Sequence, residues 1–269
     1  MKYNQILSAA ALVALAFASQ AVFAGIITTT YAGSANFGSG GVGYYVGSVA
    51  PNPISATALV GVGIGGDSFT SSDHTYDFSA TGQFNAWCVD IYHWLSGGTA
   101  TYNIATGADL AAELNTLRPG TPAGATRVTD LVRLANEVYS TVNTEVESAA
   151  FQLAVWTITY GNADTTGHYH ITPYANTDTN NPSIAGFMMD SGTASSAFGA
   201  LANTWLNNLG AVDDTENYKL TYLSDGTPIN NRTEYTQDLV VFTSVPEPAT
   251  FGLLAIGLFG LGFGIRKRG

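Results

Sequence analysis

The chain has only one cysteine among its 269 residues, Cys88, so no disulfide can form within it. Basic residues are also scarce, with nine Lys and Arg against 20 Asp and Glu. Neither the Gly-x-Ser-x-Gly pattern of serine hydrolases nor the His-Glu-x-x-His pattern of zinc peptidases occurs. We therefore expect a protein that is not an enzyme, needs no cofactor, and does not bind nucleic acid, which an acidic surface repels.

Residues 1–24 have the features of a secretory signal peptide. Lys2 is followed by an apolar stretch at 6–17, and Val22 and Ala24 suit the −3 and −1 positions of a cleavage site. A basic start, about 7–15 apolar residues and a small-residue exit are typical of such signals. We predict export and cleavage by signal peptidase after Ala24; an apolar core helix is the alternative.

The other end of the chain carries three features in order. The tripeptide Pro246-Glu247-Pro248 precedes an apolar segment at 250–265, and the basic cluster Arg266-Lys267-Arg268 follows. The segment is short for a membrane span of about 17–25 residues, but its glycines are frequent in membrane helices. Because basic clusters stay cytoplasmic, we predict one short transmembrane helix with the body on the far side of the inner membrane.

These three features resemble the PEP-CTERM sorting signal, over residues 245–269. The resemblance implies that an exosortase, a membrane transpeptidase, cuts near the Pro-Glu-Pro motif and transfers the body to the outer surface or the extracellular polymeric matrix. Anchoring in the inner membrane would then be transient, as for other tails that are removed on processing. A permanent anchor is the alternative.

Residues 25–244 form the predicted mature globular domain, with an α+β fold that has a β-rich N-terminal half, a helical middle and C-terminal strands. The polar stretch 161–193 is expected to be a long loop, and the glycines of 61–67 a turn. Apolar spacing and turn residues predict strands at 42–49, 57–64, 84–92, 218–223 and 239–245, and helices at 108–117, 127–140, 145–160 and 194–209.

The predicted helix at 145–160 is apolar nearly all round after its first turn, so it should cross the core. Thr144 and Glu147 have the spacing of a capping box at its start. Gln152 lies in its apolar part, where an amide without partners costs about 1–3 kcal/mol. Cys88 lies on a predicted buried strand, so the thiol and the amide could meet in the core.

Two segments resemble the motifs of the Cys-Gln thioester domains of bacterial surface adhesins, over residues 84–160. They are Trp87-Cys88-Val89-Asp90 and Gln152-Leu153-Ala154-Val155-Trp156. Two positions differ from the family pattern, which usually has Tyr, Phe or Leu at Trp87 and Thr at Phe151.

The resemblance implies that the Cys88 thiol attacks the Gln152 side-chain carbonyl, ammonia leaves, and an internal thioester remains. The thioester would join the protein to amines of a host, cell or matrix partner. The thiol needs a proton acceptor, for which Asp90, Tyr92 and His93 are candidates. The alternative is a non-catalytic structural or biofilm matrix protein, in which Cys88 fills the core and Gln152 bonds a backbone group.

Weaker patterns suggest a metal site, and with it a metal-dependent or glycan-acting enzyme. His168 and His170 stand two residues apart in a polar stretch, and residues 73–77 contain two Asp and one His. Such spacing is more often that of a solvated loop, so we predict no metal site.

Overall fold

The computed structural model of the protein describes residues 25–34, 44–46, 49–51, 62–71, 81–91, 98–120, 122–174, 187–209, 217–226 and 237–245, together with Phe78, His93 and Leu95. The predicted signal peptide, the Pro-Glu-Pro motif and the predicted transmembrane helix at 250–265 lie outside these residues. Within the described part of the chain, no helix is long and apolar enough to cross a membrane.

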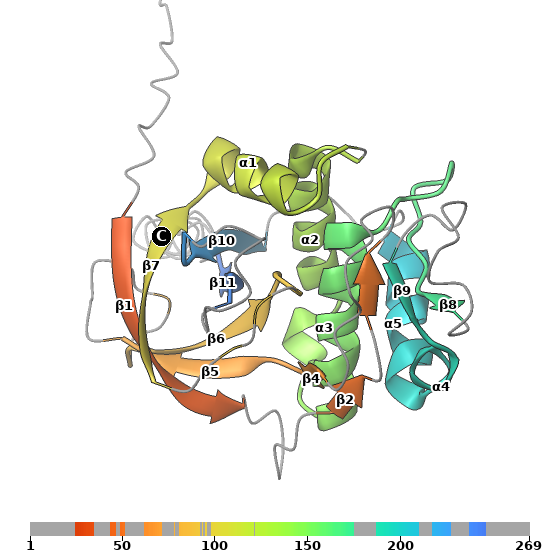
Figure 1. The fold of residues 1–269 in the computed structure, drawn as a ribbon, viewed down its shortest axis with the longest axis horizontal. Helices are drawn as coiled ribbons and strands as arrows, with labels where there is room; N and C mark the ends of the chain where they lie inside the picture. The colour runs from red at the N-terminus through yellow and green to blue at the C-terminus, as the bar shows by residue number, and fades with distance from the viewer. Residues whose placement is uncertain are drawn as a thin grey trace, which may run out of the picture.

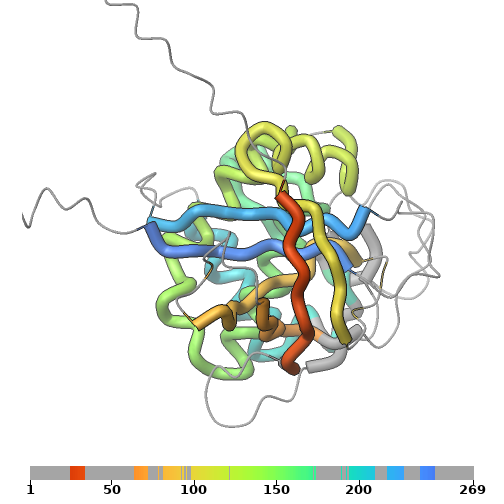
Figure 2. The backbone as a smooth tube through the Cα atoms, turned by 90° about the vertical axis from the view of Figure 1, so that its left-hand side faces the viewer, coloured from red at the N-terminus to blue at the C-terminus, as the bar shows by residue number. Residues whose placement is uncertain are grey.

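Six antiparallel strands close into a barrel (Figure 1). In their order around the barrel they are β1 (Gly25–Ser34), β5 (Asp67–Thr70), β6 (Gln83–Cys88), β11 (Leu239–Ser244), β10 (Tyr218–Ser224) and β7 (Thr99–Ala105). Figure 2 shows β10 and β11 running across β1 and β7 on one side of the molecule. Closure pairs both edges of every strand and brings the two ends of the body into one structure.

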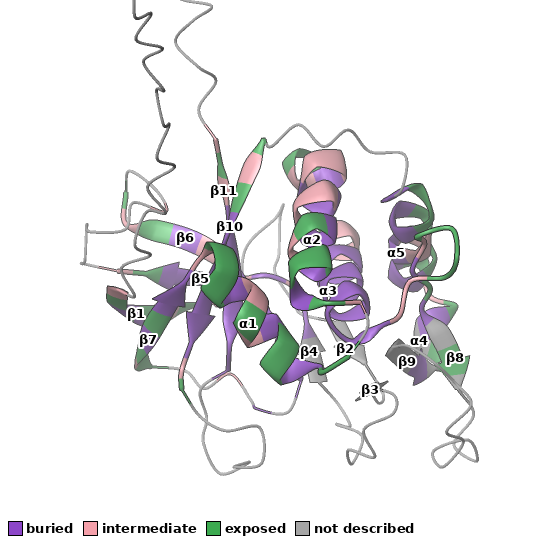
Figure 3. Cartoon of the chain, turned by 90° about the horizontal axis from the view of Figure 1, so that it is seen from above, coloured by how far each residue is buried: buried purple, intermediate pink, exposed green. Residues whose placement is uncertain are grey.

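Helices and a small second sheet cover one side of the barrel (Figures 1 and 3). Beside the barrel lie α1 (Gly107–Leu117), α2 (Gly124–Val138), η1 (Tyr139–Thr141) and α3 (Glu145–Tyr160). Beyond α3 lie α5 (Ala197–Asn208), α4 (Ser191–Ala194) and a sheet of β3 (Val49–Pro51), β9 (Phe187–Asp190) and β8 (Thr172–Tyr174). A two-stranded sheet joins β2 (Tyr44–Val46) to β4 (Val62–Ile64).

The central helix is α3, which lies between the barrel and the α5 layer (Figure 3). Every residue from Ser148 to Tyr160 is buried, as the all-round apolar pattern predicts. The predicted capping box is confirmed: the Thr144 hydroxyl accepts a hydrogen bond from the Glu147 N–H at 3.2 Å, and the Glu147 carboxylate accepts one from the Thr144 N–H at 3.0 Å. The helix therefore begins at a fixed residue and carries its side chains into the core.

The mixture of helices and strands is confirmed, but several expectations need correction. The strand predicted at 42–49 is not one element, because β2 and β3 belong to different sheets, and the strand predicted at 84–92 ends at Cys88. The stretch 161–193 is not a continuous loop, because it contains β8, β9 and the short helix α4. The helix predicted at 194–209 begins at Ala197, where the Ser196 hydroxyl accepts a hydrogen bond from the Gly199 N–H. The strand β9 pairs with β3, from a distant part of the chain, so no local pattern marks it.

Candidate functional site

Cys88 is the last residue of β6, and strand pairing fixes its surroundings. It lies opposite Leu239 of β11, while β5 pairs with the other edge of β6. The side chain is almost enclosed, since Cys88 is 7% exposed and Gln152 only 1%. Both residues therefore lie in the core, as their sequence surroundings predict.

The structure brings Gln152 of α3 directly against Cys88. The Cys88 N–H donates to Gln152 Oε1 at 3.0 Å, and Gln152 Nε2 donates to the Cys88 carbonyl oxygen at 2.6 Å. The side-chain amide thus takes the place of a missing neighbouring strand and satisfies both backbone groups of the cysteine. The two residues meet as expected, and the contacts between them run through the backbone of Cys88.

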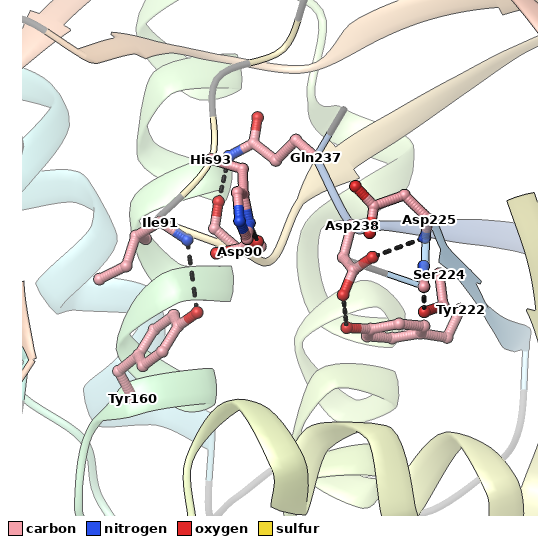
Figure 4. A network of polar contacts seen from close by, with 10 residues as sticks. Asp90, Ile91, His93, Tyr160, Tyr222, Ser224, Asp225, Gln237 and Asp238 are labelled. Atoms are coloured by element: carbon pink, nitrogen blue, oxygen red, sulfur yellow. Dashed lines mark hydrogen bonds and ion pairs between the residues drawn. The ribbon is translucent and has the colours of Figure 1, made fainter. Parts of the chain in front are cut away.

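The segment that follows Cys88 is held in the same way by α3 and by the two residues just before β11 (Figure 4). The Val89 N–H donates to the Asp238 carbonyl oxygen at 3.0 Å, and the Ile91 N–H donates to the Tyr160 hydroxyl at 3.3 Å. Gln237 Nε2 donates to the Asp90 carbonyl oxygen. Successive buried backbone groups thus have fixed partners, so the strand end that carries the thiol is rigidly placed.

Asp67 of β5 reaches the thiol itself. In the β5–β6 register Asp67 lies opposite Ala86, and Cys88 follows two residues later on the same face, which makes Cys88 a diagonal neighbour. The Cys88 Sγ–H donates to Asp67 Oδ2 at 3.8 Å, and the Tyr31 hydroxyl donates to Asp67 Oδ1 at 3.4 Å. Asp67 is partly exposed, so its carboxyl group lies between the enclosed thiol and the surface.

The turn before Asp67 is fixed against α3. The Gly66 N–H donates to the Ser148 hydroxyl at 3.0 Å, and Gly65 has a φ of +144°, a conformation that residues with a side chain rarely adopt. A Cβ atom at position 65 would lie 3.2 Å from the Ser148 hydroxyl oxygen. The turn predicted over 61–67 is therefore shorter than expected: it is confined to Gly65 and Gly66, between β4 and β5, and it sets the start of β5 beside the helix that carries Gln152.

Burial and charge set the protonation of the two groups. Burial raises the pKa of Asp67 to about 7, although hydrogen bonds from Cys88 and Tyr31 oppose the rise. Burial raises the pKa of the Cys88 thiol well above its usual value, and the nearby charges of Asp67 and Asp90 add to the effect. At neutral pH the thiol keeps its proton, while Asp67 exists in both its acid and its carboxylate form.

Of the three residues predicted as proton acceptors, the two that the structure describes, Asp90 and His93, bind each other. The Asp90 carboxylate is hydrogen-bonded to His93 Nδ1 (Figure 4), and Tyr92 lies outside the described residues. The sequence interpretation missed Asp67 because the β5–β6 pairing is what brings it to the thiol. The only local signal was an acidic residue at the end of a glycine turn.

The other residues of the two motifs, Val89, Asp90, Ala154 and Trp156, are buried. Trp87 and Phe151, the two positions that differ from the thioester-domain pattern, lie against each other with ring centroids 4.6 Å apart. Tyr139 and Phe242 complete the aromatic cluster around Phe151 at 5.2 and 5.4 Å. A large Trp in one motif is therefore packed against a large Phe in the other.

The loop with the two histidines is organised around Asp164. Its carboxylate accepts hydrogen bonds from Thr166 and from the His168 N–H, which lower its pKa, and it lies 3.4 Å from His170 Nε2. Among the residues described, no group of three or more His, Cys, Asp or Glu side chains could hold a metal ion. The other part of the weak pattern, residues 73–77, lies outside them.

Comparison with known proteins identifies the C-terminal segment. The family model of the PEP-CTERM protein-sorting motif matches residues 244–268. No curated protein matches the chain. The motif implies export, a membrane-anchored sorting signal before cleavage, and processing by an exosortase. The chain is therefore an exported protein that carries an exosortase sorting signal C-terminal to its barrel domain.

Proposed function

We propose that this exported protein attaches covalently to amine-bearing partners at the cell surface or in the extracellular matrix, through an internal thioester between Cys88 and Gln152. The observation that carries the proposal is the paired hydrogen bonding of the Gln152 amide with the backbone of Cys88. These hydrogen bonds hold the one cysteine of the chain against a glutamine that is fully buried.

The hydrogen bond from the Cys88 N–H supports the first chemical step. When Sγ attacks the Gln152 side-chain carbon, negative charge develops on Oε1, the atom that already accepts this N–H at 3.0 Å. A backbone donor aimed at a developing oxyanion, in a site that excludes water, is a strong stabiliser of such a transition state. The C–N bond of the amide then breaks, ammonia leaves, and the S–C bond remains.

The second step is acyl transfer to a partner. A primary amine attacks the thioester carbon, an amide forms at Gln152, and the thiol of Cys88 is restored. Enclosure of the site protects the thioester from hydrolysis until a suitable amine arrives. The acidic body, with 20 Asp and Glu in the chain against nine Lys and Arg, favours cationic amines as partners.

The same hydrogen bonds also support a second candidate, a structural matrix protein without a thioester. Both polar ends of the Gln152 amide are paired with the backbone of Cys88, so the amide needs no chemistry to be stable in the core. The two candidates differ in one covalent bond, which a mass measurement can detect.

The test is the intact mass of protein purified after export. A thioester makes the processed chain lighter by one ammonia molecule than the mass calculated from the sequence of that processed chain, whereas a Cys88→Ala variant processed at the same ends has its full calculated mass. Methylamine should then add to the wild-type protein at Gln152 and release one thiol, and peptide mass spectrometry locates the added group.

Gln83→Ala, at an exposed position at the start of β6, is the control, because it leaves both reacting groups in place. It should lose ammonia and take up methylamine as the wild-type protein does. A freshly prepared wild-type protein that has its full sequence mass and does not react with methylamine would support the structural candidate instead.

A further inference from the structure

We infer that Asp67 is the catalytic proton carrier of the thioester site, accepting the proton of Cys88 when the thioester forms and returning one when an amine opens it. This inference rests on the proposed function and names a residue outside both thioester motifs. Asp67 qualifies because its carboxylate touches the reacting sulfur, with Oδ2 3.8 Å from Sγ.

The position of Asp67 follows from three separate contacts. Pairing of β5 with β6 makes Asp67 and Cys88 diagonal neighbours on one face of the barrel wall. The hydrogen bond from Gly66 to Ser148 ties the start of β5 to the helix that carries Gln152. The Tyr31 hydroxyl of β1 binds the second carboxylate oxygen, so Oδ2 is left toward the thiol. Asp67 is therefore held by the strand on each side of β5 and by α3.

The reaction balances with Asp67 as the only proton carrier. In formation, the proton passes from Sγ to Oδ2 as the S–C bond forms, and Asp67 then donates it to the amide nitrogen, which leaves as ammonia. In opening, Asp67 accepts a proton from the attacking amine as the N–C bond forms, and donates it to the sulfur as the S–C bond breaks. Asp67 ends each cycle in the form in which it began, so no further reactant is needed.

The protonation of Asp67 suits this exchange. A carrier works best when its pKa lies near the ambient pH, and burial raises that of Asp67 to about 7. The titratable groups around Asp67 are Cys88, the Tyr31 hydroxyl and Tyr102 of β7. Burial raises the pKa of Tyr102, and the charges of Cys88 and Asp67 add to the rise. The charge of Asp90 contributes to the raised pKa of the Cys88 thiol. Among the described residues, no cationic side chain is one of the causes that shift the pKa of Asp67, so only the hydrogen bonds from Cys88 and Tyr31 favour its charged form.

The experiment compares the exported protein with its Asp67→Asn and Asp130→Asn variants. Asp130 is the matched control, since it is buried in α2 and accepts a hydrogen bond from a tyrosine, Tyr169, at 2.7 Å. The first readout is the fraction of chains that lack one ammonia. The second is the rate of methylamine addition, which is divided by the concentration of the unprotonated amine at each pH. General acid–base catalysis contributes about 10²–10⁴-fold, so Asp67→Asn should slow addition or formation by at least 100-fold, while Asp130→Asn should react like the wild-type protein.

A Tyr31→Phe variant separates catalysis from a structural role. Its loss of the hydrogen bond to Oδ1 removes one of the effects that lower the pKa of Asp67. The rate of methylamine addition to the wild-type thioester should rise with pH. Its midpoint should not lie below about 7, because the thioester sulfur no longer donates the hydrogen bond that lowers the pKa of Asp67, and it should move further upward in Tyr31→Phe.

The outcomes distinguish this inference from the proposed function. A wild-type protein without any thioester overturns the proposed function and the inference with it. A wild-type thioester together with wild-type formation and addition rates in Asp67→Asn overturns the inference alone, as does a midpoint that stays in place in Tyr31→Phe. Slowed reaction in Asp67→Asn with a shifted midpoint in Tyr31→Phe supports it.

Discussion

Replacing Gln152 by Leu should destabilise the protein even where no thioester can form. The change is best made in a Cys88→Ala background, which keeps the backbone N–H and carbonyl of residue 88 but removes the thiol. Leu has a similar size and an apolar side chain, so packing in α3 is largely kept. The difference between the single and the double variant then reports the two hydrogen bonds between residues 88 and 152.

The expected loss can be worked out from the structure. Gln152 is the partner of one N–H and one carbonyl group at a position that is buried in the core. Each buried polar group without a partner costs about 1–3 kcal/mol, so the double variant should lose about 2–6 kcal/mol. With a urea slope of about 2 kcal/mol per M, the unfolding midpoint should fall by at least about 1 M.

The measurement is urea unfolding followed by tryptophan fluorescence and by circular dichroism. Gln83→Leu in the same background is the control, since surface substitutions of this kind change the stability by less than about 0.5 kcal/mol. If the free energy of unfolding of the double variant lies within about 0.5 kcal/mol of that of Cys88→Ala, the amide is not the essential partner of the strand end. The reasoning behind the site would then be wrong.

Two further predictions concern pH and the start of α3. Burial raises the pKa of both Asp67 and Asp238 to about 7, above the value of about 3.9 in an unfolded chain, so the folded state binds more protons. Their stabilisation is fully present below about pH 4 and is lost as the pH rises through about 7. The urea concentration at the unfolding midpoint should therefore be lower at about pH 8.5 than at about pH 5.5, and the difference should be smaller in Asp238→Asn. Equal pH dependence in the two proteins would contradict this assignment. Thr144→Ala should lower the free energy of unfolding by about 1 kcal/mol, because it removes the capping box. The control is Thr129→Ala, which removes a hydroxyl that donates to the Ala125 carbonyl on the exposed face of α2 and should cost clearly less. Equal losses in the two variants would show that the cap contributes nothing.

The sequence was most informative where structure is local. The capping residues and the all-round apolar stretch give α3 its bounds, Glu145–Tyr160, and its place in the core. The alternating or continuous apolar runs near the C-terminus give β10 and β11 to within a residue of their observed ends. These elements depend on contacts between near neighbours in the chain, so pattern and propensity agree with the final fold.

Closure of the barrel could not be predicted from the same patterns. It depends on β1 pairing with both β5 and β7, and on β11 pairing with β6, all of which are long-range contacts without a local signal. The meeting of Cys88 and Gln152 could be expected because a buried amide needs a partner. Asp67 could not, because its approach to the thiol is a result of the β5–β6 register.

The last strand of the barrel also links the site to the tail mechanically. β11 ends at Ser244, shortly before the Pro-Glu-Pro motif, and its first residue pairs with Cys88. Tension applied to the chain beyond the body is therefore carried by β11 into the strand that holds the thiol. If such a pull detached β11, it would take away Gln237 and Asp238 and with them the partners of Asp90 and Val89, so the site would come apart early in forced unfolding.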